Sequence, residues 1–226
     1  MKMTDLFKKA LDEYQKKNFV AAIKLFEETP TEEFLEANYY LALCYVRTNQ
    51  LEKALECIDL VIVAEGDLVR LVQVKILKGW ILEQLNRIDE SLSWFESLIN
   101  EGLESAQIYG AYGNLLGKKG LKKEALSFLN MALQKDPNNP NLQNSLAHNL
   151  AELDIYLDKA LKLVRNALSR DPENFMYLDT LGWVYYKMGN LKLAHLFLKK
   201  AYQINSHHEI KSHLKLVEEK LAKKGV

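Results

Sequence analysis

The strongest constraint on the fold is a pattern of small and bulky residues that recurs about every 34 residues along the chain. A series of small residues is followed four residues later by a bulky series and, after three more, by a third series; a fourth series of small residues lies upstream. The four series are Ala22, Ala54, Ser91, Ala125, Ala160, Ala194; Phe26, Ile58, Phe95, Leu129, Val164, Leu198; Thr29, Val61, Leu98, Ala132, Ala167, Ala201; and Ala10, Ala42, Gly79, Gly113, Ala147, Gly182. Because four series keep step over six units, the pattern indicates a tandem repeat.

The period has a simple physical cause. Two helices of about 12 residues and two short turns fill about 34 residues. The offsets of four and then three residues place the first three series on one face of the second helix of each unit. The small residues let the two helices approach closely, and the bulky series fills the gap left on the other face.

Turn residues divide the chain at the same period. The prolines Pro30, Pro137, Pro140 and Pro172 lie at predicted helix boundaries, where a helix cannot continue. A residue that favours a left-handed backbone lies between the two helices of four units, at Asn49, Asn86, Gly120 and Gly189. The sequence therefore predicts helical pairs at about 3–34, 35–71, 72–105, 106–139, 140–174 and 175–208, within a single domain spanning 1–226.

A final helix is predicted at 209–224. Its apolar residues Ile210, Leu214, Val217 and Leu221 form one stripe, and charged residues cover the other faces. This pattern is typical of a capping helix that covers the last repeat and presents a polar surface to water.

The chain resembles the tetratricopeptide repeat (TPR) family. The match is best at Leu178, Leu181-Gly182, Tyr185, Ala194, Leu198 and Ala201, behind Asp171-Pro172, and the segment 178–189 is similar to bacterial members, several of which act in envelope assembly. The resemblance implies an all-α, right-handed superhelical solenoid of about six repeats and a capping helix. It also implies a concave groove, lined by the first helix of each repeat, that binds a partner peptide or helix.

Carried onto this chain, the family's groove positions fall in two zones. The apolar and aromatic N-terminal zone comprises Tyr39, Leu43, Ile76 and Trp80, and the more polar C-terminal zone comprises Asn114, Asn144, His148, Asp179, Trp183 and Tyr186. The alternative for both tryptophans is that they pack between neighbouring repeats. The cationic residues with which some family members hold chaperone C-termini are missing, so we do not expect that ligand.

Composition narrows the partners. Lys and Arg number 30, as do Asp and Glu, so there is no basic excess to bind nucleic acid. No apolar run approaches the roughly 20 residues needed to cross a bilayer, which argues against direct membrane insertion. The N-terminal segment has no signal-peptide character, so we expect a cytoplasmic protein, or a periplasmic or envelope-associated one if a leader was removed. Cys44 and Cys57 lie among apolar residues and are predicted to be buried free thiols.

No catalytic motif is present, and the sequence predicts neither an enzyme nor a cofactor or metal site. The segment 113–120 superficially suggests a phosphate loop but lacks the spacer and the hydroxyl residue. His207, His208 and His213 are interpreted as a polar start to the capping helix rather than as metal ligands. Gly110 and Gly117 are candidates either for clearing the groove floor for a ligand backbone or for a merely weak helix.

Two functional hypotheses remain. The first is a non-catalytic adaptor or scaffold that binds a partner peptide in the groove. The second is a structural scaffold that self-associates, by end-to-end stacking or by insertion of an amphipathic first helix. That helix would present Leu6, Phe7, Ala10, Leu11 and Tyr14; their alternative role is ordinary packing within the first repeat.

Overall fold

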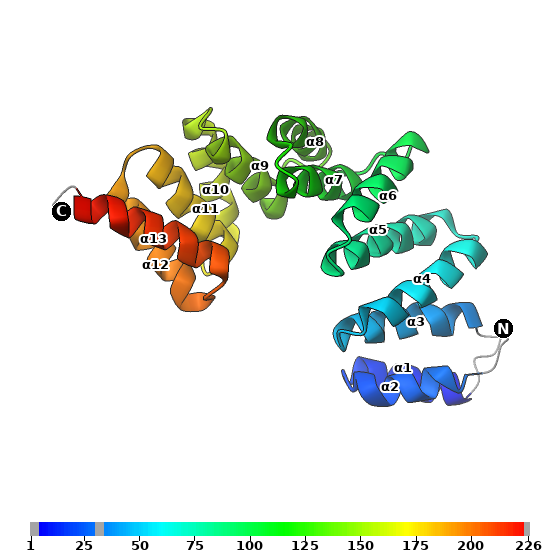
Figure 1. Ribbon diagram of the computed structural model, residues 1–226. Helices are drawn as coiled ribbons and strands as arrows, with labels where there is room; N and C mark the ends of the chain where they lie inside the picture. The colour runs from blue at the N-terminus through cyan, green and yellow to red at the C-terminus, as the bar shows by residue number, and fades with distance from the viewer. Residues whose placement is uncertain (1–4, 30–33, 224–226) are drawn as a thin grey trace. The chain divides into compact units, whose positions relative to one another are not determined.

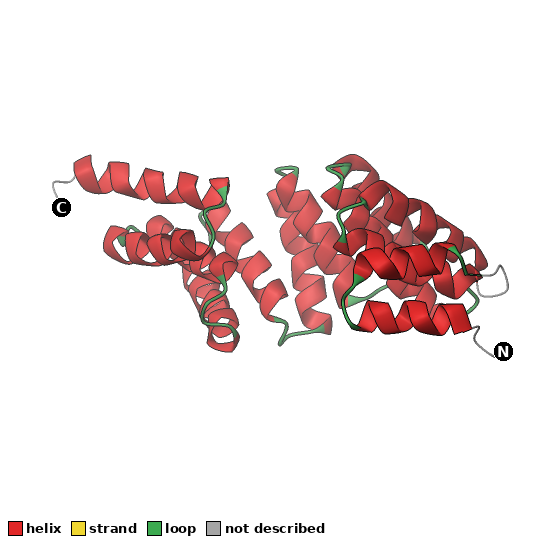
Figure 2. Ribbon diagram, turned by 90° about the horizontal axis from the view of Figure 1, so that it is seen from below, coloured by secondary structure: helices red, strands yellow, loops and turns green. Residues whose placement is uncertain are grey.

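The computed structural model describes residues 5–29 and 34–223. These residues form thirteen α-helices and no strand, joined by short loops (Figures 1 and 2). The helices are α1 Asp5–Gln15, α2 Phe19–Glu27, α3 Phe34–Arg47, α4 Leu51–Ala64, α5 Leu68–Gln84, α6 Ile88–Asn100, α7 Ala106–Lys118, α8 Lys122–Lys135, α9 Pro140–Glu152, α10 Leu157–Arg170, α11 Phe175–Lys187, α12 Leu191–Ile204 and α13 His208–Lys223. The predicted helical repeat solenoid is confirmed, while residues 3, 4 and 224 and Pro30 lie outside the described residues.

Six helical pairs are present, although α5 begins at Leu68, inside the range predicted for the second pair. Their packing follows the repeat series. The small residues of the first series and the bulky residues of the second are all buried. A Cβ atom added to Gly182 would lie 2.6 Å from Leu198 Cγ, and one added to Gly79 would lie 2.3 Å from the Phe95 ring. The close approach of the paired helices is as predicted. At Gly79, Gly113 and Gly182, however, the bulky residue of the partner helix packs against the small residue itself and not on the other face.

A left-handed residue separates the two helices of every pair. Asn49, Asn86, Gly120 and Gly189 have φ between 58° and 80°, which confirms the prediction. Lys17 and Asp154 take the same conformation in the first and fifth pairs, although neither residue type signals it as strongly as Gly or Asn. A shared reverse turn thus brings the second helix back along the first in all six repeats.

The chain groups into two compact units, residues 1–103 and 104–226. In unit 1, the pairs from α1–α2 to α5–α6 stack in chain order (Figure 1). Phe7 of α1 is 2% exposed and packs edge-on against Phe26 and Tyr40. Cys44 and Cys57 are buried free thiols, as predicted.

Unit 2 contains α7 to α13, and α13 packs against both α12 and α11. Ile210 and Val217 of α13 are buried, and Leu214 and Leu221 are partly buried against the core. The predicted apolar stripe is therefore the surface by which the final helix covers the last repeat. Side-chain caps begin α7, α9 and α11: Ser105, Asn139 and Asn174 each accept a bond from a main-chain N–H of the first turn.

Candidate functional site: a polar and aromatic face of unit 2

Helices α7, α9, α11 and α13 of unit 2 follow one another in contact and present equivalent repeat positions on one side, here called the first-helix face. Six of the ten predicted site residues belong to it. Asn114, Asn144, His148 and Tyr186 are half-buried, whereas Asp179 and Trp183 are each 7% exposed. The structure therefore leaves the first four in reach of a ligand and packs the last two inside the unit.

A buried ion pair joins α13 to α11. His213 Nδ1 lies 3.0 Å from Asp179 Oδ1 and 3.2 Å from Oδ2, and both side chains are 10% exposed. Burial by itself lowers the pKa of His213, but the hydrogen bond to the Asp179 carboxylate and its charge outweigh burial and raise that pKa. The pair favours an imidazolium at position 213, where the sequence was interpreted as a polar helix start.

The pKa of the neighbouring His148 is shifted in the opposite direction. The His148 ring centroid on α9 lies 6.5 Å from that of His213. Burial lowers the pKa of His148, and this effect exceeds the opposing charges of Glu152 and Asp179. The first-helix face thus holds two close histidines whose protonation the fold drives in different directions.

Trp183 lies at the centre of this face. Its ring stacks on His213 with centroids 4.1 Å apart and on Tyr186 with centroids 4.8 Å apart. Its Nε1–H donates to Glu152 Oε1 at 2.6 Å, and Glu152 also pairs with Lys122. Of the two interpretations of Trp183, packing between repeats is the one that the structure supports.

Two residues of this site were not identified from the sequence, Glu152 and His213. A signal for each was available in the repeat register. His213 follows Asp179 by 34 residues and therefore occupies the position of Asp179 in the last helix. Glu152 likewise shares the position of Lys118 and Lys187. Extending the register through the final helix would have placed both on the first-helix face.

The four other predicted site residues lie in unit 1, on α3 and α5. Tyr39, Leu43 and Ile76 are half-buried, and Trp80 is 40% exposed. The Arg70 guanidinium lies 4.6 Å above the Tyr39 ring and forms a two-point ion pair with Glu36. Trp80 is therefore open to solvent, in contrast to Trp183.

Gly110 and Gly117 serve the packing of α9. A Cβ atom on Gly110 would lie 2.5 Å from Leu142 Cδ2, and one on Gly117 would lie 2.9 Å from Asn149 Oδ1. Side chains of α9 already occupy the space beside both glycines. The hypothesis that these glycines admit a ligand backbone is therefore wrong.

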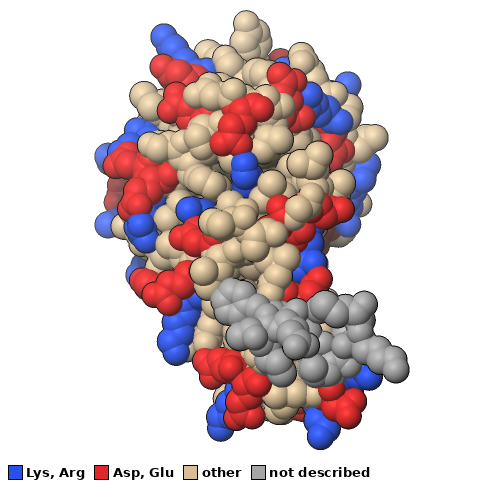
Figure 3. All heavy atoms as spheres, turned by 90° about the vertical axis from the view of Figure 1, so that its right-hand side faces the viewer, with Lys and Arg blue, Asp and Glu red and all other residues tan. Residues whose placement is uncertain are grey.

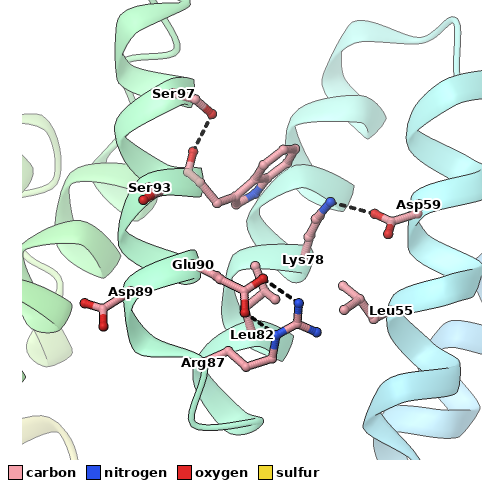
Figure 4. A pocket seen from close by; sticks show the side chains of 10 residues that line it. Leu55, Asp59, Lys78, Leu82, Arg87, Asp89, Glu90, Ser93 and Ser97 are labelled. Atoms are coloured by element: carbon pink, nitrogen blue, oxygen red, sulfur yellow. Dashed lines mark hydrogen bonds and ion pairs between the residues drawn. The ribbon is translucent and has the colours of Figure 1, made fainter.

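A surface pocket of about 500 Å³ lies on α4, α5 and α6 of unit 1 (Figure 4). Its charged groups are paired with one another: Lys78 Nζ lies 2.7 Å from Asp59 Oδ1, and Arg87 Nε donates to Glu90 at 2.7 Å. Trp94 forms one wall and donates to the Lys75 carbonyl at 2.8 Å. The pocket pairs no nucleophile with a base, and we assign it no chemistry.

Charge and hydropathy add little to this description. Acidic and basic side chains are interspersed on the face drawn in Figure 3. Within the described residues, no cluster of three or more His, Cys, Asp or Glu side chains is arranged to hold a metal ion. None of the described helices combines the length and the apolar character that a membrane span requires.

Comparison with known proteins identifies the repeat. The tetratricopeptide repeat model matches residues 177–208, which correspond to the α11–α12 pair. A TPR repeat-containing protein of Pseudomonas aeruginosa is 24% identical over 208 residues, covering 90% of this chain and 34% of that protein. A TPR repeat-containing protein of Methanocaldococcus jannaschii is 33% identical over 103 residues, covering 46% of this chain and 18% of that protein. The chain thus spans about a third or less of either relative's length.

Solved structures share the fold. The type IV pilus biogenesis factor PilW superposes with a TM-score of 0.71 at 18% identity, covering 94% of this chain and 96% of that one. YrrB, described as a TPR protein with an unusual peptide-binding site, superposes with a TM-score of 0.56 at 23% identity, covering 87% and 97%. The α11–α12 pair thus matches the tetratricopeptide repeat, and the chain is similar over most of its length to a TPR repeat-containing protein and shares the fold of these solved structures.

Proposed function

We propose that the chain is a non-catalytic adaptor that binds a partner peptide on the first-helix face of unit 2. The observation that carries the proposal is that four polar or aromatic side chains on three successive first helices remain half-buried there: Asn114, Asn144, His148 and Tyr186. YrrB, which shares this fold, is described as having an unusual peptide-binding site.

The chemistry of the face suits a polypeptide backbone. Asn114 and Asn144 each carry an amide group, which can both donate and accept hydrogen bonds. Each amide–backbone bond is worth about 1 kcal/mol net, so several are needed for useful affinity. Tyr186 adds aromatic surface for an apolar side chain of the ligand.

Self-association through the first helix is less well supported. The aromatic residues that would be inserted into another copy are engaged within unit 1, where Phe7 and Tyr14 pack against Tyr40. Releasing α1 would expose Phe7, whose side chain is almost fully buried. Burying such a ring contributes about 1.5–3 kcal/mol, which disfavours the exchange.

The test is a selection of short random peptides displayed on phage against the purified chain, followed by binding measurements on the recovered peptides. The matched variants are Asn114→Ala with Asn144→Ala, and, in unit 1, Trp80→Ala. Peptides that bind the wild type and the Trp80→Ala variant but lose affinity for the double asparagine variant support the proposal. Recovered peptides that depend on Trp80 alone would move the binding site to unit 1 and refute the assignment to unit 2.

A further inference from the structure

We infer that the peptide bound on the first-helix face of unit 2 is an acidic segment, whose carboxylates are held by Lys187 and Lys220 beside the Trp183–Tyr186 stack. This inference rests on the proposed function and adds the chemical class of the ligand.

The two ammonium groups come from different helices and meet the same aromatic stack. Lys187 Nζ of α11 lies 5.2 Å from the Trp183 ring centroid, and Lys220 Nζ of α13 lies 4.3 Å from that of Tyr186. The ring faces attract the two cations through their quadrupoles. The stack thus holds two positive charges at the end of the face where α11 and α13 terminate.

No described carboxylate forms an ion pair with Lys187 or Lys220. The acidic side chains of the face already have partners: Asp179 pairs with His213, and Glu152 pairs with Lys122 and accepts a hydrogen bond from Trp183 Nε1–H. An incoming carboxylate would therefore be the first to pair with Lys187 and Lys220.

The acidic residues of α13 also form their ion pairs with residues other than Lys187 and Lys220. Glu218 lies 3.4 Å from His195 Nε2, and Glu219 lies 3.9 Å from Lys215 Nζ. Glu209 belongs to the first turn of α13, whereas Lys220 belongs to the last. Lys187 and Lys220 are therefore the two lysines that contact the Trp183–Tyr186 stack, in a chain whose net charge is zero.

Helix geometry places a further lysine along the same edge. Lys118 and Lys187 are the last residues of α7 and α11 and share one repeat position. The carboxyl end of a helix carries partial negative charge, which favours a lysine there in the absence of a ligand.

A polypeptide fits this site better than a nucleic acid. A nucleic acid presents a phosphate at every nucleotide and requires many cations in a continuous track. Here Glu152 interrupts the row between Lys118 and Lys187, and Asn114, Asn144 and His148 occupy the rest of the face. Two lysines beside amides suit a few carboxylates on a hydrogen-bonding backbone.

The experiment uses the displayed-peptide selection on the full chain. We expect the peptides selected by the wild type to be enriched in Asp and Glu. Replacing one carboxylate of a selected peptide by its amide should lower affinity about twofold to fivefold, the range of a partly exposed ion pair. The double variant Lys187→Gln, Lys220→Gln should bind the acidic peptides more weakly. Most of the salt dependence of their binding should also be lost. The exposed α12 pair Lys192→Gln with Lys199→Gln is the matched control and should change neither.

The outcomes separate the two proposals. Selected peptides that depend on Asn114 and Asn144 but carry no acidic enrichment, or bind the Lys187→Gln, Lys220→Gln variant unchanged, would overturn the inference and leave the proposed function standing. If the selection recovers no peptide whose binding depends on the first-helix face, both proposals are overturned. A short single-stranded oligonucleotide that binds more tightly than the peptides, with the same lysine dependence, would overturn the assignment to a peptide. Equal helicity of all variants by circular dichroism shows that each comparison reports binding.

Discussion

Replacing Asp179 by Asn tests whether a charged pair holds the final helix on unit 2. The amide keeps an oxygen that can accept a hydrogen bond from His213, but it loses the negative charge. Both side chains of the wild-type pair are 10% exposed, with Nδ1 and Oδ1 3.0 Å apart. The variant would therefore leave a protonated His213 buried without its counter-charge.

The loss of folding stability caused by Asp179→Asn depends on pH. Removing one partner of a buried ion pair costs about 3–5 kcal/mol as long as the other partner stays charged. His213 can avoid this cost by losing its proton, after which the loss is at most that of one hydrogen bond, about 1 kcal/mol. We therefore expect Asp179→Asn to destabilise unit 2 by roughly 3 kcal/mol at acidic pH and by about 1 kcal/mol or less at alkaline pH.

The direction follows from the pKa of His213, which the Asp179 pair raises above its ordinary value. A raised pKa in the folded protein means that the pair stabilises fully below the ordinary value and that this contribution is lost as pH rises through the raised value. The wild type should thus exceed the variant most at the acidic end. His148, whose pKa burial lowers, destabilises both proteins on acidification. Because the Asp179 charge opposes that lowering, its loss adds to the destabilisation of the variant at acidic pH.

The assay is urea unfolding followed by circular dichroism at about pH 5.5 and about pH 8.5, on either side of the ordinary histidine pKa. Proton NMR of the His213 ring should show a lower pKa in the variant than in the wild type. Glu173→Gln removes an exposed carboxylate from the turn before α11 and is the control. A destabilisation by Asp179→Asn that is equal at the two pH values, or larger at about pH 8.5, would refute the ion pair.

Three further predictions concern the packing of the repeats. Gly182→Ala should lower the stability of unit 2 by about 1–2 kcal/mol in urea unfolding, because overpacking against a leucine of α12 at 2.6 Å exceeds the roughly 1 kcal/mol gain in helix propensity; an unchanged midpoint would contradict the close approach. Ser91→Ala should cost about 1 kcal/mol in the same assay, because the buried hydroxyl donates to a main-chain carbonyl of α5 at 2.8 Å. Burial raises the pKa of the Cys44 and Cys57 thiols to about 11 from an ordinary 9.0, so their thiolate fraction falls roughly a hundredfold. A thiol reagent near neutral pH should label both cysteines much faster in urea than in buffer, and fast labelling of the native chain would show that unit 1 is more open.

The architecture was predictable because it depends on residue size and on backbone conformation, and both repeat. Gly79 and Phe95 show this: a glycine on one helix and a bulky side chain on its partner recur one period later as Gly113 and Leu129. The turn at Gly120 was equally predictable from the sequence, because its positive φ strongly favours glycine. Lys17 adopts the same backbone against its own preference because the packed helices on either side impose it.

The chemistry of the face was only partly predictable, because it depends on contacts between repeats. The family positions correctly placed Asn144 and His148 on one side, but they could not show that Trp183 is enclosed by His213. That contact requires the final helix to continue the repeat register, whereas its apolar stripe indicates only which side is buried. Likewise, Gly117 appeared free to receive a ligand until Asn149 of the next repeat was placed beside it.

The final helix therefore has two roles that its sequence pattern separates. Its apolar stripe, with Val217 at the centre, covers the last repeat, as expected of a cap. Two residues outside that stripe, His213 and Lys220, complete the first-helix face by contacting Trp183 and Tyr186. A cap that served only to shield the core would gain nothing from placing a buried charge at His213, since desolvating a charge opposes folding. The cost is intelligible if α13 also forms one wall of a binding surface, because the ion pair then fixes the register in which Lys220 reaches Tyr186.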